Sequence, residues 1–248
     1  MNPKIERRVV TQINEYFEPR SIFDLIKTAA LRDRSMMTLC FVSAGRISEV
    51  VGGPVYFWDK KTHHAVKTEK RHPGLKRENL KVSDKVILIT GMKVVKRSHK
   101  LIEKYGSQIA IRDDFAVPLE LGLFQSVFWD QLVPFGWIIK EYLDTEAPKK
   151  GKLFEYEDTR AWQIIRETTK MFPNWFRSQA EHFYGHYLLP DTVKLAKFVK
   201  IQDPKHVKHY IGYAWTEQLK DTQISMDFNW IDKTVQEIKN RLDVYKTI

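Results

Sequence analysis

The sequence predicts an α+β fold that is mainly helical and contains a small, basic antiparallel sheet. Apolar residues recur at helical spacing at both ends of the chain, whereas the segment between them, Val51–Lys100, is punctuated by Gly and Pro and holds short apolar runs typical of strands. The 248 residues suit one domain of about 200–250 residues or two small ones.

The N-terminal part of the chain is expected to be helical. Periodicity predicts helices at Ile5–Phe17 and Ser21–Leu31, separated at Pro19, and then a mostly buried helix at Arg32–Val42. A turn of small residues leads into a short helix that begins near Arg46.

The sheet is expected after these helices. The apolar run Val86–Ile89 lies within Lys81–Thr90, and a further strand is expected at Ile109–Leu119. The remaining helices are expected at Leu121–Leu143, Asp158–Met171, Trp175–Leu188, Thr192–Val199, Asp203–Gln218 and Asn229–Tyr245.

Composition excludes several classes of protein. With 43% hydrophobic and 29% charged residues, the chain is not expected to be disordered. It holds no apolar run near the roughly 18–20 residues that cross a bilayer, and its polar N-terminus, Met1–Arg8, does not resemble a secretory signal. The one cysteine, Cys40, excludes an internal disulfide and a Cys-based zinc site, so we expect an intracellular, cytoplasmic protein. Association with DNA is expected from its charge pattern and from a family resemblance.

Positive charge is concentrated in one segment. The chain has 41 Lys+Arg and 31 Asp+Glu, a formal net charge of +10, and Lys60–Lys104 alone holds 14 of the basic residues against 4 acidic ones. A basic segment on an otherwise neutral chain is typical of proteins that bind a polyanion, most often nucleic acid. The alternative is a solvated, lysine-rich loop.

Four short segments carry a family resemblance. Ser43–Glu49 places Arg46 after a small-residue turn and a carboxylate one helical turn later, which can hold an arginine fork rigidly. Gly91–Lys93, Asn174–Arg177 and finally Tyr210 follow in order. Together they resemble the first arginine box, the lysine-bearing turn, the His-x-x-Arg box and the nucleophilic tyrosine of tyrosine recombinases, the phage-integrase family.

The resemblance runs from about Ser21 to Tyr213 and is greatest to archaeal virus and plasmid integrases. The stretch from Arg112 to Leu119 is similar to the strand that closes the family's small sheet, and Leu153–Ile165 to the stretch before the second arginine box. The resemblance implies a catalytic domain over residues 1–220, with 1–18 as the end of an N-terminal helix or linker, and a C-terminal helix over 221–248. The family's core-binding domain is expected to be absent.

The resemblance implies DNA strand cleavage and religation without a metal or cofactor. Tyr210 would attack a phosphodiester and form a 3′-phosphotyrosyl bond, because a positioned tyrosine can form a covalent intermediate. Arg46 and Arg177 would stabilise the phosphate with forked donors, and Lys93 would protonate the 5′-oxygen that leaves. Glu49 would hold Arg46 in place.

Two positions depart from the family pattern. Asn174 stands where relatives usually have His, and an amide cannot carry a proton. Ile201 stands where they have His or Trp, and the neighbouring Lys200 could supply a donor instead. His182 and His186 are four residues apart on a predicted helix, but no third ligand lies at a useful spacing, so no metal site is expected.

Several assignments have alternatives. Lys96 is a second candidate for the acid, and Tyr213 for the nucleophile. Contacts with DNA phosphates are expected from Lys76, Arg77, Lys96, Arg97 and Lys100.

The expected partner is a double-stranded DNA attachment site, bound by a homo-oligomer that is a tetramer on DNA, with a monomer as an alternative for the free protein. The apolar face of the tail, Asp221–Ile248, either docks on a neighbouring protomer, as in the family, or packs on its own domain. The leading function is a site-specific recombinase, or integrase. The alternatives are a catalytically impaired DNA-binding relative, a type IB topoisomerase that relaxes DNA, and a structural polyanion binder.

Overall fold

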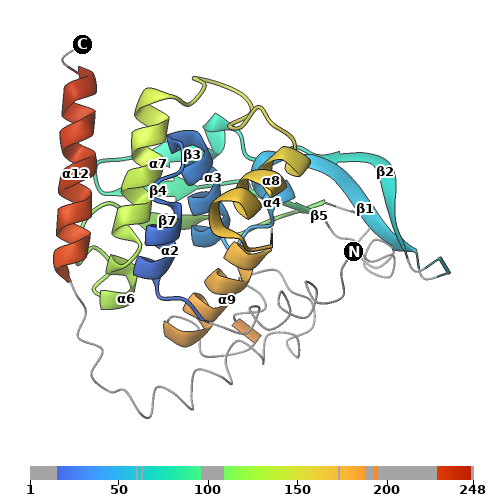
Figure 1. Cartoon of the computed structure of the whole chain (residues 1–248), viewed down its shortest axis with the longest axis horizontal. Helices are drawn as coiled ribbons and strands as arrows, with labels where there is room; N and C mark the ends of the chain where they lie inside the picture. The colour runs from blue at the N-terminus through green and yellow to red at the C-terminus, as the bar shows by residue number, and fades with distance from the viewer. Residues whose placement is uncertain are drawn as a thin grey trace.

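A computed structural model of the chain describes residues 16–59, 61–62, 64–95, 109–172, 174–187, 193–194 and 228–246, and these residues form an α+β fold (Figure 1). The long helices stand side by side, and a two-stranded hairpin extends away from them. The fold class therefore agrees with the mixed α+β expectation.

The first helices are α2 (Pro19–Ile26), α3 (Leu31–Val42) and α4 (Ile47–Val51). Pro19 begins α2. Proline is tolerated at this position because the N–H groups in the first turn of a helix have no intrahelical acceptor, so the N–H that proline lacks is not missed. The expected extension of this helix to Leu31 is wrong: α2 ends at Ile26, and a turn with an extended Ala30 lets α3 start in a new direction.

Helix α3 is the centre of the hydrophobic core. Met36, Leu39 and Cys40 have no exposed surface, and α3 packs against α7 (Val133–Thr145) and α9 (Trp175–Tyr187). Burial raises the pKa of the Cys40 thiol, which keeps it protonated and unreactive.

The strands form three antiparallel units among the described residues, where one small sheet was expected. They are the hairpin β1 (Gly53–Asp59) and β2 (His64–His72), the sheet β3 (Leu80–Val82), β4 (Val86–Ile89) and β7 (Phe115–Pro118) in the order β3-β4-β7, and the pair β5 (Lys93–Val95) and β6 (Ile109–Ile111). The expected single strand Ile109–Leu119 is thus divided, because β6 pairs with β5 whereas β7 pairs with β4.

The later helices agree with the sequence except at one start. In place of a helix over Leu121–Leu143, turns occupy residues 119–125 and are followed by α6 (Val127–Asp130) and α7. Gly122 and Gln125 have φ values of 72° and 51°, which a helix does not accommodate. Helices α8 (Asp158–Thr169) and α9 lie as expected. Apart from residues 193–194, the helices expected between 192 and 218 lie outside the described residues.

The C-terminal helix α12 (Phe228–Lys246) packs on α7 of its own chain. Ile231, Ile238 and Leu242 are buried, and Arg241 donates to both carboxylate oxygens of Glu141 at 2.6 and 2.9 Å. In this single chain, α12 therefore covers one side of α7. None of the described helices is both long and apolar enough to span a membrane.

Candidate active site

Glu49 holds Arg46 from two sides at the start of α4. The backbone N–H of Arg46 donates to Glu49 Oε2 at 2.9 Å, and Arg46 Nη1 donates to Oε1 at 2.8 Å. A carboxylate in the first turn satisfies a helix N–H that has no intrahelical partner and is favoured by the helix dipole. The pair expected from the sequence is present.

Arg177 approaches the same carboxylate from α9, which is distant from α4 in the sequence. Trp175 and Phe176 are fully buried and fix the first turn of α9 in the core. From there Arg177 Nη1 lies 3.9 Å from Glu49 Oε2, and Arg177 Nε lies 2.7 Å from Glu181 Oε1. Glu49 is therefore shared by the two arginines predicted to act together.

The turn before Arg46 is shaped by close contacts. Ala44 has a φ of 46°, and its carbonyl accepts a hydrogen bond of 2.8 Å from Arg177 Nη1, so the strained backbone is held by one of the site arginines. At Gly45 a side chain would meet its neighbours, since a Cβ would lie 2.6 Å from Met92 Cε and 2.6 Å from Ser43 Oγ. Glycine thus allows the start of β5 to approach the Arg46 turn.

Two charged residues join the cluster that the sequence did not assign to it. Arg112, 4% exposed, interacts electrostatically with Glu49, and Glu181 pairs with Arg177. The four-residue spacing of Arg177 and Glu181 on one helix was a usable signal. Nothing local marks Arg112, because its place beside Glu49 depends on the pairing of β5 with β6.

The cluster of Arg46, Glu49, Arg112, Arg177 and Glu181 contains three cations and two carboxylates. Burial lowers the pKa of Arg177, and it lowers the pKa of Arg112 to about 10 although Glu49 opposes this. Burial would raise the pKa of Glu49, but the charges of Arg46, Arg177 and Arg112 outweigh it and hold that pKa below its usual value. With Glu49 ionised, the cluster has one positive charge in excess, which is complementary to an added anion.

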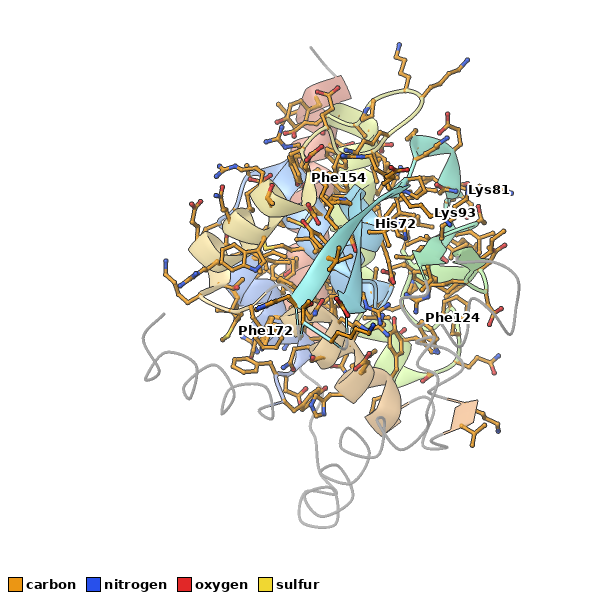
Figure 2. The ribbon with its side chains drawn as sticks, turned by 90° about the vertical axis from the view of Figure 1, so that its right-hand side faces the viewer. His72, Lys81, Lys93, Phe124, Phe154 and Phe172 are labelled. Atoms are coloured by element: carbon orange, nitrogen blue, oxygen red, sulfur yellow. The ribbon has the colours of Figure 1, made fainter. Side chains whose placement is uncertain are left out.

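Lys93 is the exposed first residue of β5, on the strand that approaches Arg46. It lines a hollow of about 180 Å³ with Lys76, Asn79, Gly91 and the Pro73–Gly74 turn. Figure 2 looks onto this side of the molecule, with Lys93 drawn near His72, the residue before that turn. Two lysines at one hollow make it suited to an anion.

The remaining predicted residues have no described contact with the Arg46–Glu49 pair or with the hollow beside Lys93. Arg77 donates to the Leu80 carbonyl at 2.8 Å and so supports its own loop. Asn174 is exposed just before α9, and its carbonyl accepts the Ser178 N–H. Outside the described residues lie Tyr210, Lys200, Lys96, Arg97, Lys100 and Tyr213, together with Ile201.

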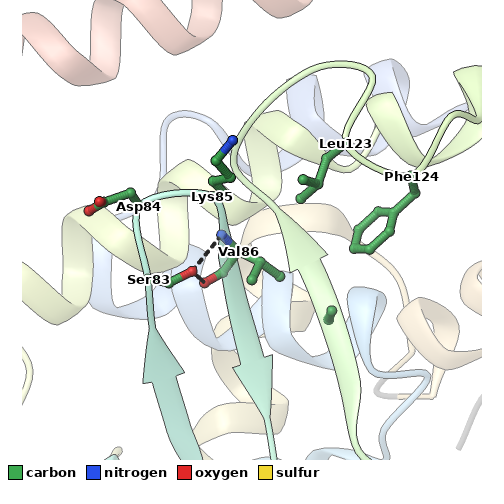
Figure 3. Close-up of a pocket in the computed structure, with 7 residues that line it drawn as sticks. Ser83, Asp84, Lys85, Val86, Leu123 and Phe124 are labelled. Atoms are coloured by element: carbon green, nitrogen blue, oxygen red, sulfur yellow. Dashed lines mark hydrogen bonds between the residues drawn. The ribbon is translucent and has the colours of Figure 1, made fainter.

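A second hollow, of about 450 Å³, lies between the β3–β4 turn and the loop after β7 (Figure 3). Val86, Leu123 and Phe124 give it an apolar lining, and Ser83 closes the turn by bonding to Val86. It contains none of the predicted site residues. Across the described ranges, no three His, Cys, Asp or Glu side chains come together as metal ligands.

Comparisons of the chain with protein-family models, with curated proteins and with solved structures found no match.

Proposed function

We propose that the protein is a DNA strand transferase of the tyrosine-recombinase type, a site-specific integrase. In this proposal Tyr210 attacks a phosphodiester, Arg46 and Arg177 stabilise the phosphate, and Lys93 donates a proton to the departing 5′-oxygen. The phosphotyrosyl bond conserves the energy of the bond that was cleaved, so religation needs no further cofactor.

The observation that carries the proposal is the sharing of Glu49 by Arg46 and Arg177. Arg46 contacts it at 2.8 Å and Arg177 at 3.9 Å, from elements far apart in the sequence. The side chain of Arg46 is 29% exposed and that of Arg177 is 7% exposed, so Arg46 is the better placed to meet a phosphate directly. The surplus of positive charge at this cluster supports an anionic substrate.

The test uses nicked duplexes with a randomised central sequence, because the attachment site is unknown. The nick lets the short cleaved strand diffuse away and traps a covalent protein–DNA adduct, which is detected on a denaturing gel and sequenced. We expect the wild-type protein and Tyr213→Phe to form the adduct and Tyr210→Phe to bind DNA without forming it. An adduct in Tyr210→Phe, or none in the wild type, would overturn the proposal.

The catalytically impaired relative remains a second candidate because of Asn174. This residue is exposed at the start of α9 where an imidazole would be expected to assist proton transfer. Under this alternative, wild-type protein binds the duplex pool with steep salt dependence and leaves no adduct, whereas Asn174→His gains one.

A further inference from the structure

Arg112 is the one cation of the cluster that the proposed chemistry does not use. A strand transfer by Tyr210, Arg46, Arg177 and Lys93 requires no third arginine, yet Arg112 is 4% exposed and bears the cost of burying a guanidinium. A charge retained at such a cost calls for a role within the site.

The contacts of Arg112 lead to the residue before Lys93. Its N–H donates to the Met92 carbonyl at 2.8 Å, and its Nη1 lies 4.0 Å from Met92 Sδ. The Cε of Met92 approaches Gly45 so closely that a Cβ there would lie 2.6 Å away. Met92, itself 2% exposed, is thus enclosed between Arg112 and the Arg46 turn.

The charges of the cluster also act on the Arg112 guanidinium. Glu49 attracts it, whereas Arg177 and Arg46 repel it. A displacement of Arg112 would move Met92, and β5 begins at the next residue.

We infer that Arg112 is a positioning residue that acts through Met92 to set Lys93 in register with the Arg46–Glu49 pair. The inference rests on the proposed function, because it assigns Arg112 to the proton-donation half of that reaction. In the cleavage step Tyr210 loses its phenolic proton to water and its oxygen bonds to phosphorus, the bond from phosphorus to the 5′-oxygen breaks, and the Lys93 ammonium gives its proton to that oxygen.

Removing the charge of Arg112 is therefore expected to impair only the protonation of the leaving 5′-oxygen. Arg112→Met keeps much of the side-chain volume and removes the charge, so Lys93 loses its alignment while Arg46 keeps its bonds to Glu49. We expect single-turnover cleavage to slow by about 10–100-fold, part of the roughly 10²–10⁴-fold that a placed general acid supplies. Arg112→Lys, which retains the charge, should recover part of that loss.

The experiment measures cleavage of the site recovered from the randomised pool, with either oxygen or sulfur as the bridging 5′ atom. A thiolate leaves without a proton, so the sulfur substrate does not need Lys93. We expect Arg112→Met to be slow on the oxygen substrate and close to the wild-type rate on the sulfur substrate, like Lys93→Ala. Arg160→Met, an exposed arginine on α8, is the matched control and should follow the wild type on both.

Each other outcome overturns the inference in a different way. If Arg112→Met cleaves the oxygen substrate at the wild-type rate, Arg112 has no positioning role. If it is slowed equally on both substrates, it acts on the phosphate and not on the leaving group. If the wild type forms no adduct, the proposed function has failed first. Should Arg112→Met not fold, Met92→Ala removes the same side-chain contact between Arg112 Nη1 and Met92 Sδ. It must then also be slow on the oxygen substrate and close to the wild-type rate on the sulfur substrate.

Discussion

Two buried glutamates, Glu49 and Glu141, each lie between arginines, and the surroundings of the two carboxylates differ. At Glu141 on α7, Arg241 forms two hydrogen bonds of 2.6 and 2.9 Å, and Arg34 lies 3.4 Å away. Both carboxylates are 2% exposed, but 44% of the Arg241 side chain remains in contact with solvent, against 7% for Arg177.

The pKa values of the arginines differ between the clusters at one residue, Arg241. The hydrogen bond to Glu141 raises the pKa of Arg241, so this cation is stabilised by its partner. Burial lowers the pKa values of Arg112 and Arg177 at Glu49 and also that of Arg34 at Glu141, so these three cations are kept at a cost. Glu141 attaches α12 to the domain, whereas Glu49 lies among three arginines, two of which are buried.

The largest expected effect is on stability when each carboxylate is neutralised. We expect Glu49→Gln to lower the free energy of unfolding by about 3–5 kcal/mol, because it leaves Arg112 and Arg177 buried without their shared anion. Glu141→Gln should cost about 1–3 kcal/mol, because Arg241 can turn towards water and Arg34 keeps its hydrogen bond to the Lys27 carbonyl.

Urea unfolding curves of the two variants, with the exposed Glu69→Gln as a control, measure these free energies. Equal losses of unfolding free energy for Glu49→Gln and Glu141→Gln would show that the two clusters contribute equally to stability.

Acid should distinguish the wild type from Glu49→Gln. The pKa of Glu49 is held below its unfolded value of about 4.3, so its contribution to stability is complete above that pH and is lost as the pH falls through the folded pKa. Urea midpoints between pH 7 and pH 3 should therefore fall less steeply in Glu49→Gln than in the wild type. Parallel curves would contradict the assignment of an ionised Glu49.

Sequence spacing predicted the contact between Arg46 and Glu49, but it did not predict the contacts that the other arginines make in the two clusters. The Arg46–Glu49 pair lies within one helical turn, and so its geometry could be foreseen from spacing alone. The approach of Arg177 to Glu49 and of Arg112 to Met92 depends on the packing of α9 and on the pairing of β5 with β6, which no window of sequence encodes. The same holds for Arg34 and Arg241, which both contact Glu141 only because α3 and α12 pack on α7.

The predicted start of a helix at Leu121 was wrong, again because contacts between segments and not local spacing decide the structure there. The apolar residues there have helical spacing, but Leu121 and Phe124 remain exposed in turns. Asp130 accepts a hydrogen bond of 2.7 Å from the Gly122 N–H and so ties the loop to α6. Tertiary contacts with the loop outweighed its periodicity.

A smaller effect is expected from the α12 contact itself. Arg241→Gln should cost about 0.5–1 kcal/mol, because a half-exposed ion pair is screened by water. Adduct formation by this variant should equal that of the wild type, since neither Arg241 nor Glu141 is among the residues proposed to act on DNA. Thermal unfolding and the adduct assay measure the two quantities, with the exposed Gln236→Ala on the same helix as control. A loss of adduct at unchanged stability would give α12 a role in catalysis.

The smallest effect extends the comparison to the surface above each cluster. Lys76 is exposed at the hollow that it shares with Lys93, whereas Lys140 on α7 is paired with Asp144 at 2.8 Å. If the Glu49 side of the molecule faces DNA, Lys76→Gln removes one phosphate contact and makes the log–log salt slope of duplex binding shallower by about one unit.

Lys140→Gln, on the Glu141 side, should leave that slope unchanged. Filter binding to the same duplex pool between 50 and 200 mM salt, roughly the range over which such contacts change affinity most visibly, gives both slopes. A change in slope for Lys140→Gln without one for Lys76→Gln would place the DNA on α7. The surplus charge around Glu49 would then serve some anion other than the DNA backbone.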